Sequence, residues 1–201
     1  MSLGKKFYRQ DAVTVAEELV GKLLIRKING QEIKCRIVET EAYMGAEDKA
    51  SHAYQNKRTP RTEVMFKSGG YVYVYLIYGM YYCFNVVTGI KNKPGAVLIR
   101  AVEPLSGIDI IKKNRKIKSD KKQNLTNGPG KICQALQIDE NFDGYNLIKA
   151  DDLYIEENTG RKEKDNVEIG TGKRVNIDYA EEYQDKLWRF YMKDNTFVSG
   201  N

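Results

Sequence analysis

Residues 71–85 of the chain read YVYVYLIYGMYYCFN and hold six of its fourteen tyrosines. Aromatic and aliphatic residues first alternate strictly, which is the period of a β-strand, and both classes of residue favour strands. The alternation breaks at Tyr78-Gly79-Met80, and a second strand-like run follows up to Val87. Because Gly79 is the one glycine in this stretch, it is the natural place for the chain to reverse direction. The pattern predicts a β-hairpin with residues 78–80 near its tip.

The tip of this predicted hairpin carries side chains that are costly to leave in water, a tyrosine at 78 and a methionine at 80. Two interpretations are open. The tip can pack on a neighbouring element of the same chain. Alternatively, it can act as a wedge that enters a flat and stackable partner, such as a base step of DNA.

Size and composition limit what the chain can be. It has 201 residues, of which 41% are hydrophobic, so we expect one folded domain over residues 1–201. No apolar run approaches the roughly 20 residues of a membrane helix, and the N-terminus lacks the apolar core of a signal peptide. Three cysteines far apart and a single histidine do not suggest a disulfide framework or a His-rich site. We expect a reduced, intracellular, cytoplasmic monomer with no metal, no cofactor and no membrane partner.

The charge of the chain is basic, with a formal net charge of +6 and a pI near 9.0. A basic surface suits a polyanionic partner, but many basic proteins bind no nucleic acid, so charge alone is weak evidence. The densest basic run, KKNRKIKSDKK at residues 112–122, is typical of a solvated loop or helix face.

A second hairpin is predicted upstream, where Asn-Gly at 29–30 separates the strand-like segments 23–28 and 32–43. The odd positions of the second segment begin apolar and end with Glu39 and Glu41. If the strand is regular, both carboxylates share the apolar face, where they are costly unless paired and where burial raises their pKa. A twist or bulge that leaves them solvated, or pairing with arginines, is the alternative.

Two further segments combine apolar sequence with cationic side chains. Residues 96–102, AVLIRAV, predict a strand interrupted by Arg100, whose guanidinium must face solvent or find a carboxylate or phosphate. Residues 127–131, NGPGK, precede ICQAL, which looks like the start of a helix. Free N–H groups and a lysine at a helix N-terminus suit a phosphate, although a loop that only caps the helix explains the pattern equally.

The remaining elements are predicted from periodicity and turn residues. They are a helix within 11–23 with Asp11 as its N-cap and Gly21 as a possible C-terminal breaker, a long loop with short helical turns over 44–70, strands at 153–155 and 187–191, a charged loop at 160–166 and a connector at 176–182.

Taken together, these segments resemble the alkyladenine (3-methyladenine or methylpurine) DNA glycosylases. The matching blocks are RIVETEAYMGAEDKASH (36–52), RTPR (58–61), MF (65–66), YVYLIYGMYYCFN (73–85), AVLIRAVEPL (96–105) and GPGKICQAL (128–136). The resemblance extends from about residue 8 to RFY at 189–191 and weakens after about residue 140.

The resemblance implies an α+β fold: a single domain with a curved antiparallel sheet and a protruding β-hairpin, similar to the C-terminal domain of methionyl-tRNA formyltransferase. It implies a monofunctional DNA glycosylase of base excision repair, without lyase activity. Such an enzyme flips alkylated or deaminated purines, of the 3-methyladenine, 7-methylguanine, hypoxanthine and ethenoadenine class, from double-stranded DNA through the minor groove. A glutamate-activated water then hydrolyses the N-glycosidic bond. In a bacterium such a protein would associate with the nucleoid.

Residue by residue, the resemblance implies that Glu41 is the general base and that Arg100 helps to hold the base and its water. The other matched positions are the base pocket at Tyr43, His52, Tyr75 and Asn85, the intercalating tip at Tyr78, Met80 and Tyr81, and DNA-backbone contacts at Lys57, Arg58, Arg61 and Lys131. Asn85 matches the asparagine that discriminates against the 2-amino group of guanine. Lys57 and Gly130 stand where the human pattern has arginine and serine, which changes the contacts to the DNA backbone. Phe84 stands where it has methionine, at the back of the pocket, so the substrate range is not carried over. The family pattern does not use Glu39 as an acid, so the resemblance implies that Glu39 is a structural partner.

A non-catalytic nucleic-acid-binding module of the same fold is the alternative. The combination of Glu41, Arg100 and Asn85 argues against it, because pure binding needs no buried carboxylate near an anionic backbone. A carboxylate-dependent hydrolase acting on a non-nucleic N-glycoside is a third hypothesis.

Overall fold

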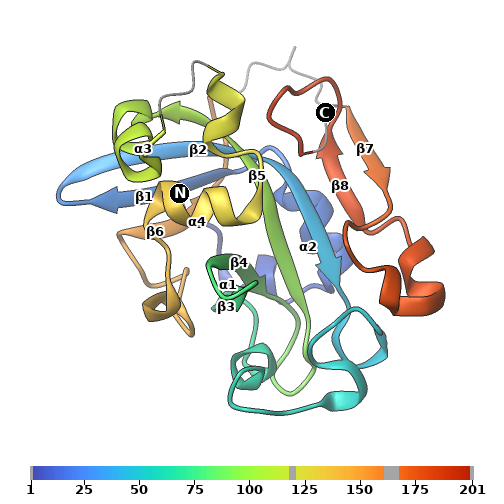
Figure 1. Cartoon of the computed structure of the whole chain (residues 1–201). Coiled ribbons are helices and arrows are strands. Elements are labelled where there is room, and N and C mark those ends of the chain that lie inside the picture. The colour runs from blue at the N-terminus through green and yellow to red at the C-terminus, as the bar shows by residue number, and fades with distance from the viewer. Residues whose placement is uncertain (1, 118–120, 161–167, 200–201) are drawn as a thin grey trace.

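Two long strands form the middle of the structure, a computed structural model that describes residues 2–117, 121–160 and 168–199 (Figure 1). Among these residues, eight strands form one antiparallel sheet in the order β3-β4-β5-β2-β1-β6, with β8 paired to β2 and β7 to β8. The strands are β1 (Leu23–Ile28), β2 (Gln31–Tyr43), β3 (Val72–Ile77), β4 (Tyr81–Val87), β5 (Ala96–Ser106), β6 (Leu153–Glu156), β7 (Ile169–Gly172) and β8 (Arg189–Met192).

Helices cover the sheet and complete an α+β fold. The α-helices are α1 (Lys5–Tyr8), α2 (Ala12–Leu19), α3 (Ile108–Arg115) and α4 (Pro129–Leu136), and the 3-10 helices are η1 (Gly45–Glu47), η2 (Tyr54–Asn56), η3 (Glu63–Phe66), η4 (Lys122–Leu125), η5 (Glu140–Phe142) and η6 (Asp178–Asp185). In Figure 1, α4 lies in front of the sheet and α2 behind it. No helix in the described ranges is long and apolar enough to cross a membrane.

The predicted N-terminal helix and the hairpin after it are confirmed, with one boundary shifted. The carboxylate of Asp11 accepts a hydrogen bond from the Thr14 N–H at 3.0 Å, so Asp11 is the N-cap of α2. The helix ends at Leu19, two residues before the predicted breaker Gly21, whose φ is 92°. Strands β1 and β2 then pair antiparallel across the Asn-Gly turn.

Strand β2 is irregular, and its irregularity curves the sheet. It pairs with β5 on one side and with β1 and then β8 on the other. Its pairing with β5 shifts register between Ile37 and Glu39, which leaves Val38 as an extra residue, and shifts again beside Arg100. Bulges of this kind bend strands and re-aim side chains. Figure 1 shows β2 and β5 bending together through the middle of the molecule.

The predicted tyrosine-rich hairpin is β3 paired with β4. Tyr78 and Gly79 have φ values of 54° and 67°, and the Met80 N–H donates to the Ile77 carbonyl at 3.2 Å. The tip is not buried against a neighbouring element, since Tyr78 is 72% exposed and Met80 is 65% exposed. The interpretation in which Tyr78 and Met80 pack on a neighbouring element of the same chain is therefore wrong.

The C-terminal third differs most from expectation. The last strand is displaced to Arg189–Met192, and residues 176–182, predicted as a connector, run into η6. Strand β7 was not predicted, because its sequence, IGTG, has two glycines and no apolar alternation. The predicted loop at 160–166 falls almost entirely outside the described residues, as do positions 118–120 of the basic run. The rest of that run lies in α3 and η4 and just after α3.

Candidate active site

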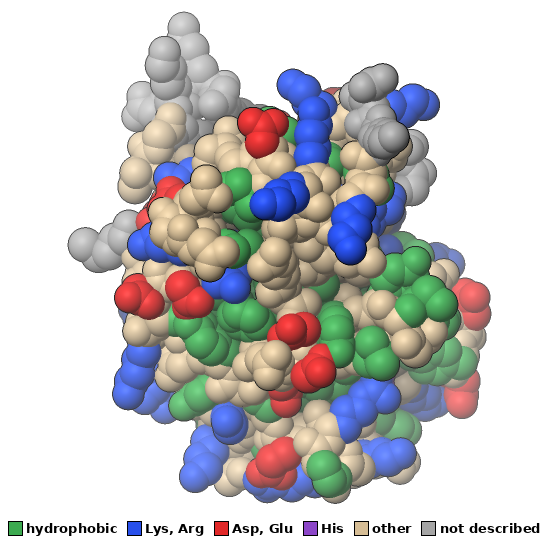
Figure 2. All heavy atoms as spheres, turned by 60° about the vertical axis from the view of Figure 1, so that its left-hand side comes forward, with side chains coloured by type: hydrophobic (Ala, Val, Ile, Leu, Met, Phe, Trp, Pro, Cys, Tyr) green, Lys and Arg blue, Asp and Glu red, His purple; other side chains and the backbone are tan. Residues whose placement is uncertain are grey.

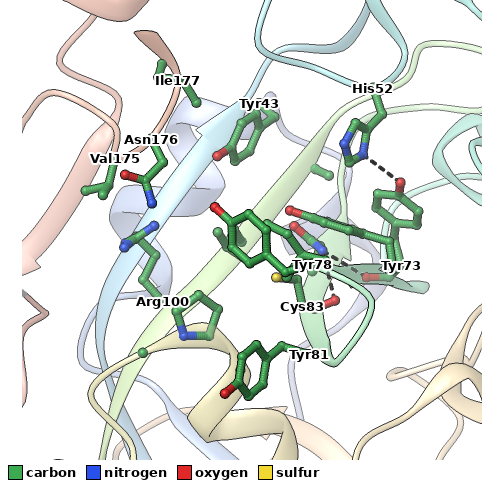
Figure 3. A pocket seen from close by; sticks show the side chains of 18 of the residues that line it. Tyr43, His52, Tyr73, Tyr78, Tyr81, Cys83, Arg100, Val175, Asn176 and Ile177 are labelled. Carbon is green, nitrogen blue, oxygen red and sulfur yellow. Dashed lines mark hydrogen bonds between the residues drawn. The ribbon is translucent and has the colours of Figure 1, made fainter. Parts of the chain in front are cut away.

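A cavity of about 630 Å³ lies beside the hairpin. Its lining comes from β2, the 50–52 loop, Arg61, η3, the hairpin of β3 and β4, β5, the end of α3, α4 and the segment 175–179. Figure 3 shows the aromatic and polar side chains of these elements converging on one space, with Tyr78 and Tyr81 on the hairpin side and Val175, Asn176 and Ile177 opposite.

Aromatic rings form the walls of the cavity. Tyr43 comes from β2, Tyr73 and Tyr75 from one face of β3, and His52 from the preceding loop. The ring centroids of His52 and Tyr75 lie 4.7 Å apart edge to face, and those of Tyr73 and Tyr75 lie 5.5 Å apart. The i, i+2 spacing of a strand brings the two tyrosines together. Tyr73 was not predicted as a pocket residue, although the alternation places it on the face of Tyr75.

The ring of His52 is held at both nitrogens. Its Nδ1 lies 2.8 Å from the Tyr73 hydroxyl, and its Nε2 lies 3.3 Å from the Arg61 guanidinium. A guanidinium can only donate, so Nε2 is the acceptor and Nδ1 carries the proton. Burial, together with the positive charges of Arg61 and Lys57, lowers the pKa of His52 to about 4. At neutral pH the cavity therefore presents a neutral imidazole.

We expect His52 to titrate near pH 4 in the folded protein, against an ordinary pKa of 6.5. Between these values the unfolded chain binds a proton that the folded chain does not, so the free energy of unfolding falls as the pH falls from 6.5 toward 4. Because His52 is the sole histidine, its ring proton gives a unique NMR signal. The same titration in concentrated urea is the control and should centre near 6.5; a folded-state midpoint above 6 would contradict this environment.

The carboxylate of Glu41 lies directly behind the cavity wall and is fully buried. It accepts hydrogen bonds from the Val175 N–H at 2.7 Å and the Tyr43 hydroxyl at 2.9 Å, and Arg100 Nη1 lies 3.3 Å away. Glu41 is not one of the lining residues, but all three of these partners are. Burial raises the pKa of Glu41, while Arg100, the Val175 N–H and the Tyr43 hydroxyl favour the ionised form and limit that rise.

These contacts decide whether Glu39 and Glu41 of β2 are solvated or paired with arginines. The strand is bulged, yet Glu39 and Glu41 are fully buried rather than solvated. Both pair with Arg100, which meets Glu39 through Nε at 3.3 Å, and Glu39 also pairs with Arg189 at 3.0 Å. Arg100, which interrupts the apolar strand β5, is therefore paired with carboxylates and is buried from solvent.

Asn85 lines the cavity and is buried. Its Nδ2 donates to the backbone carbonyls of Tyr73 at 3.0 Å and Cys83 at 3.2 Å. Both amide hydrogens are thus used by the strands, which leaves the side-chain oxygen as the polar atom free to face a ligand.

The cationic residues assigned to DNA-backbone contacts divide into two groups. Arg61 stacks on Tyr75 at 5.0 Å and lines the cavity, as does Lys131, whose Nζ donates to Asn127 at 2.6 Å. Lys57 and Arg58 do not line it, and Arg58 is paired with Glu63 at 2.6 Å. On the face drawn in Figure 2, basic side chains are spread among acidic ones over the surface, so charge alone does not mark an interface.

The main residues missed by the sequence analysis belong to the segment 174–179. The guanidinium of Arg174 forms two hydrogen bonds to the carboxylate of Asp48, at 2.5 and 2.9 Å, and a third to the Ala42 carbonyl at 2.9 Å. This buried pair anchors the segment that brings the Val175 N–H to Glu41. A backbone donor leaves no trace in the sequence, so no signal could have found Val175.

The fold places a cavity with aromatic walls beside a buried carboxylate, and the exposed Tyr78 of the hairpin tip is among the residues that line it. The chain belongs to the methylpurine-DNA glycosylase (MPG) family, whose sequence profile matches residues 6–196. It is 58% identical to a protein of Natranaerobius thermophilus over the full length of both chains. It is 52% identical to one of Clostridium perfringens, over 99% of each chain, and 51% identical to one of Borrelia garinii, over 98% of this chain and 99% of the relative. These relatives are provisionally named 3-methyladenine DNA glycosylases.

Proposed function

We propose that this protein is a monofunctional DNA glycosylase of base excision repair that removes alkylated or deaminated purines from duplex DNA. The observation that carries the proposal is the buried pair Glu41 and Arg100, 3.3 Å apart, behind an aromatic cavity beside the exposed Tyr78. Family membership supports the substrate class. In this proposal residues 1–201 form one glycosylase unit, with a fold similar to the formyltransferase C-terminal domain.

The hairpin supplies the first step, capture of an extruded nucleotide. A base inside a duplex cannot be attacked, so it must leave the stack, and the hole needs a filler. The ring of Tyr78 is large, flat and exposed, with Met80 and Tyr81 beside it, so the tip can enter the minor groove as a wedge. Arg61 and Lys131 at the cavity, with Lys57 and Arg58 outside it, would contact the phosphates.

Replacing Tyr78 with asparagine should abolish this capture without harming the turn. Tyr78 has a left-handed backbone conformation, which asparagine adopts more easily than tyrosine, so the hairpin should keep its shape and lose only the wedge. Wild type should change the fluorescence of an ethenoadenine duplex on binding, and the variant should lose most of that change. Leu187→Asn, at another exposed apolar residue, is the control. An unchanged fluorescence response in Tyr78→Asn would refute the wedge.

The cavity supplies the second step, recognition of the extruded base. Tyr43, Tyr75 and neutral His52 present aromatic faces and edges to a flat ring. Base–aromatic stacking is worth about 1–3 kcal/mol per base. Electron-poor alkylated purines should stack best, because a positive ring is attracted to an electron-rich tyrosine face. Since the amide hydrogens of Asn85 are already bonded, its discrimination against a 2-amino group would rest on lack of space.

The buried acid supplies the chemistry. Glu41 would accept a proton from a water whose oxygen bonds to C1′ of the sugar as the bond from C1′ to the base nitrogen breaks. The transition state resembles an oxocarbenium ion, which a nearby carboxylate stabilises. A cationic base such as 7-methylguanine leaves as a neutral molecule, whereas hypoxanthine must be protonated as it leaves. Arg100 holds Glu41 in its ionised form and faces the cavity, where it can position the water.

The direct test is to incubate the protein with methylated duplex DNA and to identify the released bases. We expect free 3-methyladenine and 7-methylguanine, with strands that break only after treatment with alkali. Lys131 also lines the cavity, so borohydride should be added to trap a Schiff base; a trapped adduct would refute the monofunctional mechanism. Binding of damaged duplex without any released base would refute catalysis and favour a binding module of the same fold.

A further inference from the structure

We propose that Glu39 and Ser199 are positioning residues that fix the orientation of Arg100 toward Glu41 and the cavity. This inference rests on the proposed function and deepens it, because it assigns a role to the second buried acid and brings the segment after β8 into the site.

The first observation is the complete enclosure of Glu39, whose carboxylate is fully buried. It accepts hydrogen bonds from the Ser199 N–H at 2.7 Å, the Ser199 hydroxyl at 2.9 Å and Arg189 Nη1 at 3.0 Å, besides Arg100 Nε at 3.3 Å. All four partners are donors, so the environment fits an ionised carboxylate. A group that would itself act as an acid needs a proton to give, whereas Glu39 only accepts hydrogen bonds from these four donors.

The second observation is that each nitrogen of Arg100 has a different partner. Nε meets Glu39 at 3.3 Å, Nη1 meets Glu41 at 3.3 Å and Nη2 donates to the Ser199 hydroxyl at 3.4 Å. The same hydroxyl donates to Glu39, which is consistent with one donor and two acceptor positions. Three contacts around a planar group fix both its position and its tilt. Arg100 therefore approaches Glu41 in an orientation set by Glu39 and Ser199.

The third observation is the balance of charge. Glu39 and Glu41 are opposed by Arg100 and Arg189, and Arg189 stands opposite Glu41 in the register of β2 and β8. Removing one carboxylate leaves an excess of positive charge in a buried place. Glu39 therefore has two functions. It orients Arg100, and its negative charge holds this guanidinium between the two carboxylates, so that Arg100 does not pair with Glu41 alone.

The charges around Glu41 affect the pH at which its carboxylate ionises. The charged and titratable groups that face Glu41 are Arg100 on β5, Glu39 and Tyr43 on β2, Cys83 on β4 and Tyr179 in the segment opposite the hairpin. Burial raises the pKa of the tyrosines and the thiol, so they stay neutral near pH 7. The negative charge of Glu39 raises the pKa of Glu41. Its removal should lower that pKa.

The test compares Glu39→Gln with Glu103→Gln in single-turnover excision of 7-methylguanine. Glu103 is the matched control: it is a partly buried acid that pairs with Arg36 and accepts a bond from Asn195, but it lies outside the cavity. A catalytic group displaced by about 1 Å can cost about 10²-fold in rate, and we expect a loss of this order for Glu39→Gln. Affinity for the damaged duplex should stay within about threefold, an outcome expected because Glu39 touches no substrate.

The pH profile separates positioning from a merely structural role. For Glu39→Gln the acidic limb of the profile should move to lower pH, whereas the limb of Glu103→Gln should coincide with wild type. Because 7-methylguanine leaves without protonation, and because His52 contacts neither Glu39 nor Glu103, a difference between the limbs of the two variants reports the ionisation of Glu41. Equal rates and superimposable profiles for the two variants would overturn the inference.

Substitutions of Ser199 provide a second test in case Glu39→Gln does not fold. Ser199→Ala removes one hydroxyl from a partly buried residue, and we expect a several-fold fall in rate that Ser199→Thr largely restores. A rate of Ser199→Ala equal to wild type would overturn the role of Ser199. If wild type itself releases no base, the proposed function fails; if wild type is active and these variants match it, only the positioning role fails.

Discussion

Replacing Glu41 with glutamine is expected to lower single-turnover excision by about 10²- to 10⁴-fold, the usual contribution of a general base. Glutamine has nearly the same shape but cannot take a proton from water or stabilise a developing cation. Its NH₂ group would also face the donors that now surround Glu41, namely the Val175 N–H, the Tyr43 hydroxyl and Arg100. The loss should appear in the rate of base release and not in the affinity for damaged duplex.

The control for this substitution is Glu32→Gln, because Glu32 lies on the same strand, β2, but is exposed at its far end. Base release by Glu32→Gln should equal that of wild type. Thermal unfolding of both variants should be measured, so that a fold defect is not taken for lost chemistry. Excision by folded Glu41→Gln at the wild-type rate would exclude Glu41 as the base.

Replacing Asp48 with asparagine is expected to cost about 3–5 kcal/mol of unfolding free energy, because it leaves the buried Arg174 without its charged partner. The pair is fully buried, and the Asp48 carboxylate also accepts the N–H groups of Met44 and Ala50 at 3.0 Å. For a chain of this size the melting temperature should fall by roughly 10 °C. Differential scanning calorimetry provides the measurement.

The matched control is Asp185→Asn, which removes the partner of Lys173, the residue next to Arg174. This ion pair is equally short, at 2.6 Å, but both side chains are 64% exposed, so solvent screens it and we expect no measurable change in melting temperature. The double variant Asp48→Asn/Arg174→Gln should lose less than the sum of the single losses, since no unpaired buried charge remains. Equal melting temperatures for Asp48→Asn and Asp185→Asn would contradict the anchoring role.

Local signals predicted the parts of the site that lie close together in the chain. The alternation of residues 71–77, with Gly79 after it, is sufficient to specify a hairpin, because strand period and turn conformation depend on neighbouring residues. The same holds for Asn-Gly at 29–30. The exposure of the tip and the burial of the acids of β2 were left open by these signals and became known from the structure. The assignment of Tyr78, Glu41 and Arg100 to particular chemistry came from the resemblance to a family and not from these patterns.

The tertiary structure decided which groups contact Glu39 and Glu41. The bulge after Ile37 changes the direction of the side chains of β2. No residue at that point predicts it, because a bulge depends on the pairing with β5. The N–H of Val175 lies 134 positions from Glu41, and Ser199 lies 160 positions from Glu39. Contacts over such separations form only when the sheet curls and brings β8 and its flanking segments against β2. The sequence by itself therefore determined the hairpin and the place of the two acids on β2, whereas packing determined their burial and their partners, because a backbone donor and a curved sheet carry no local signature.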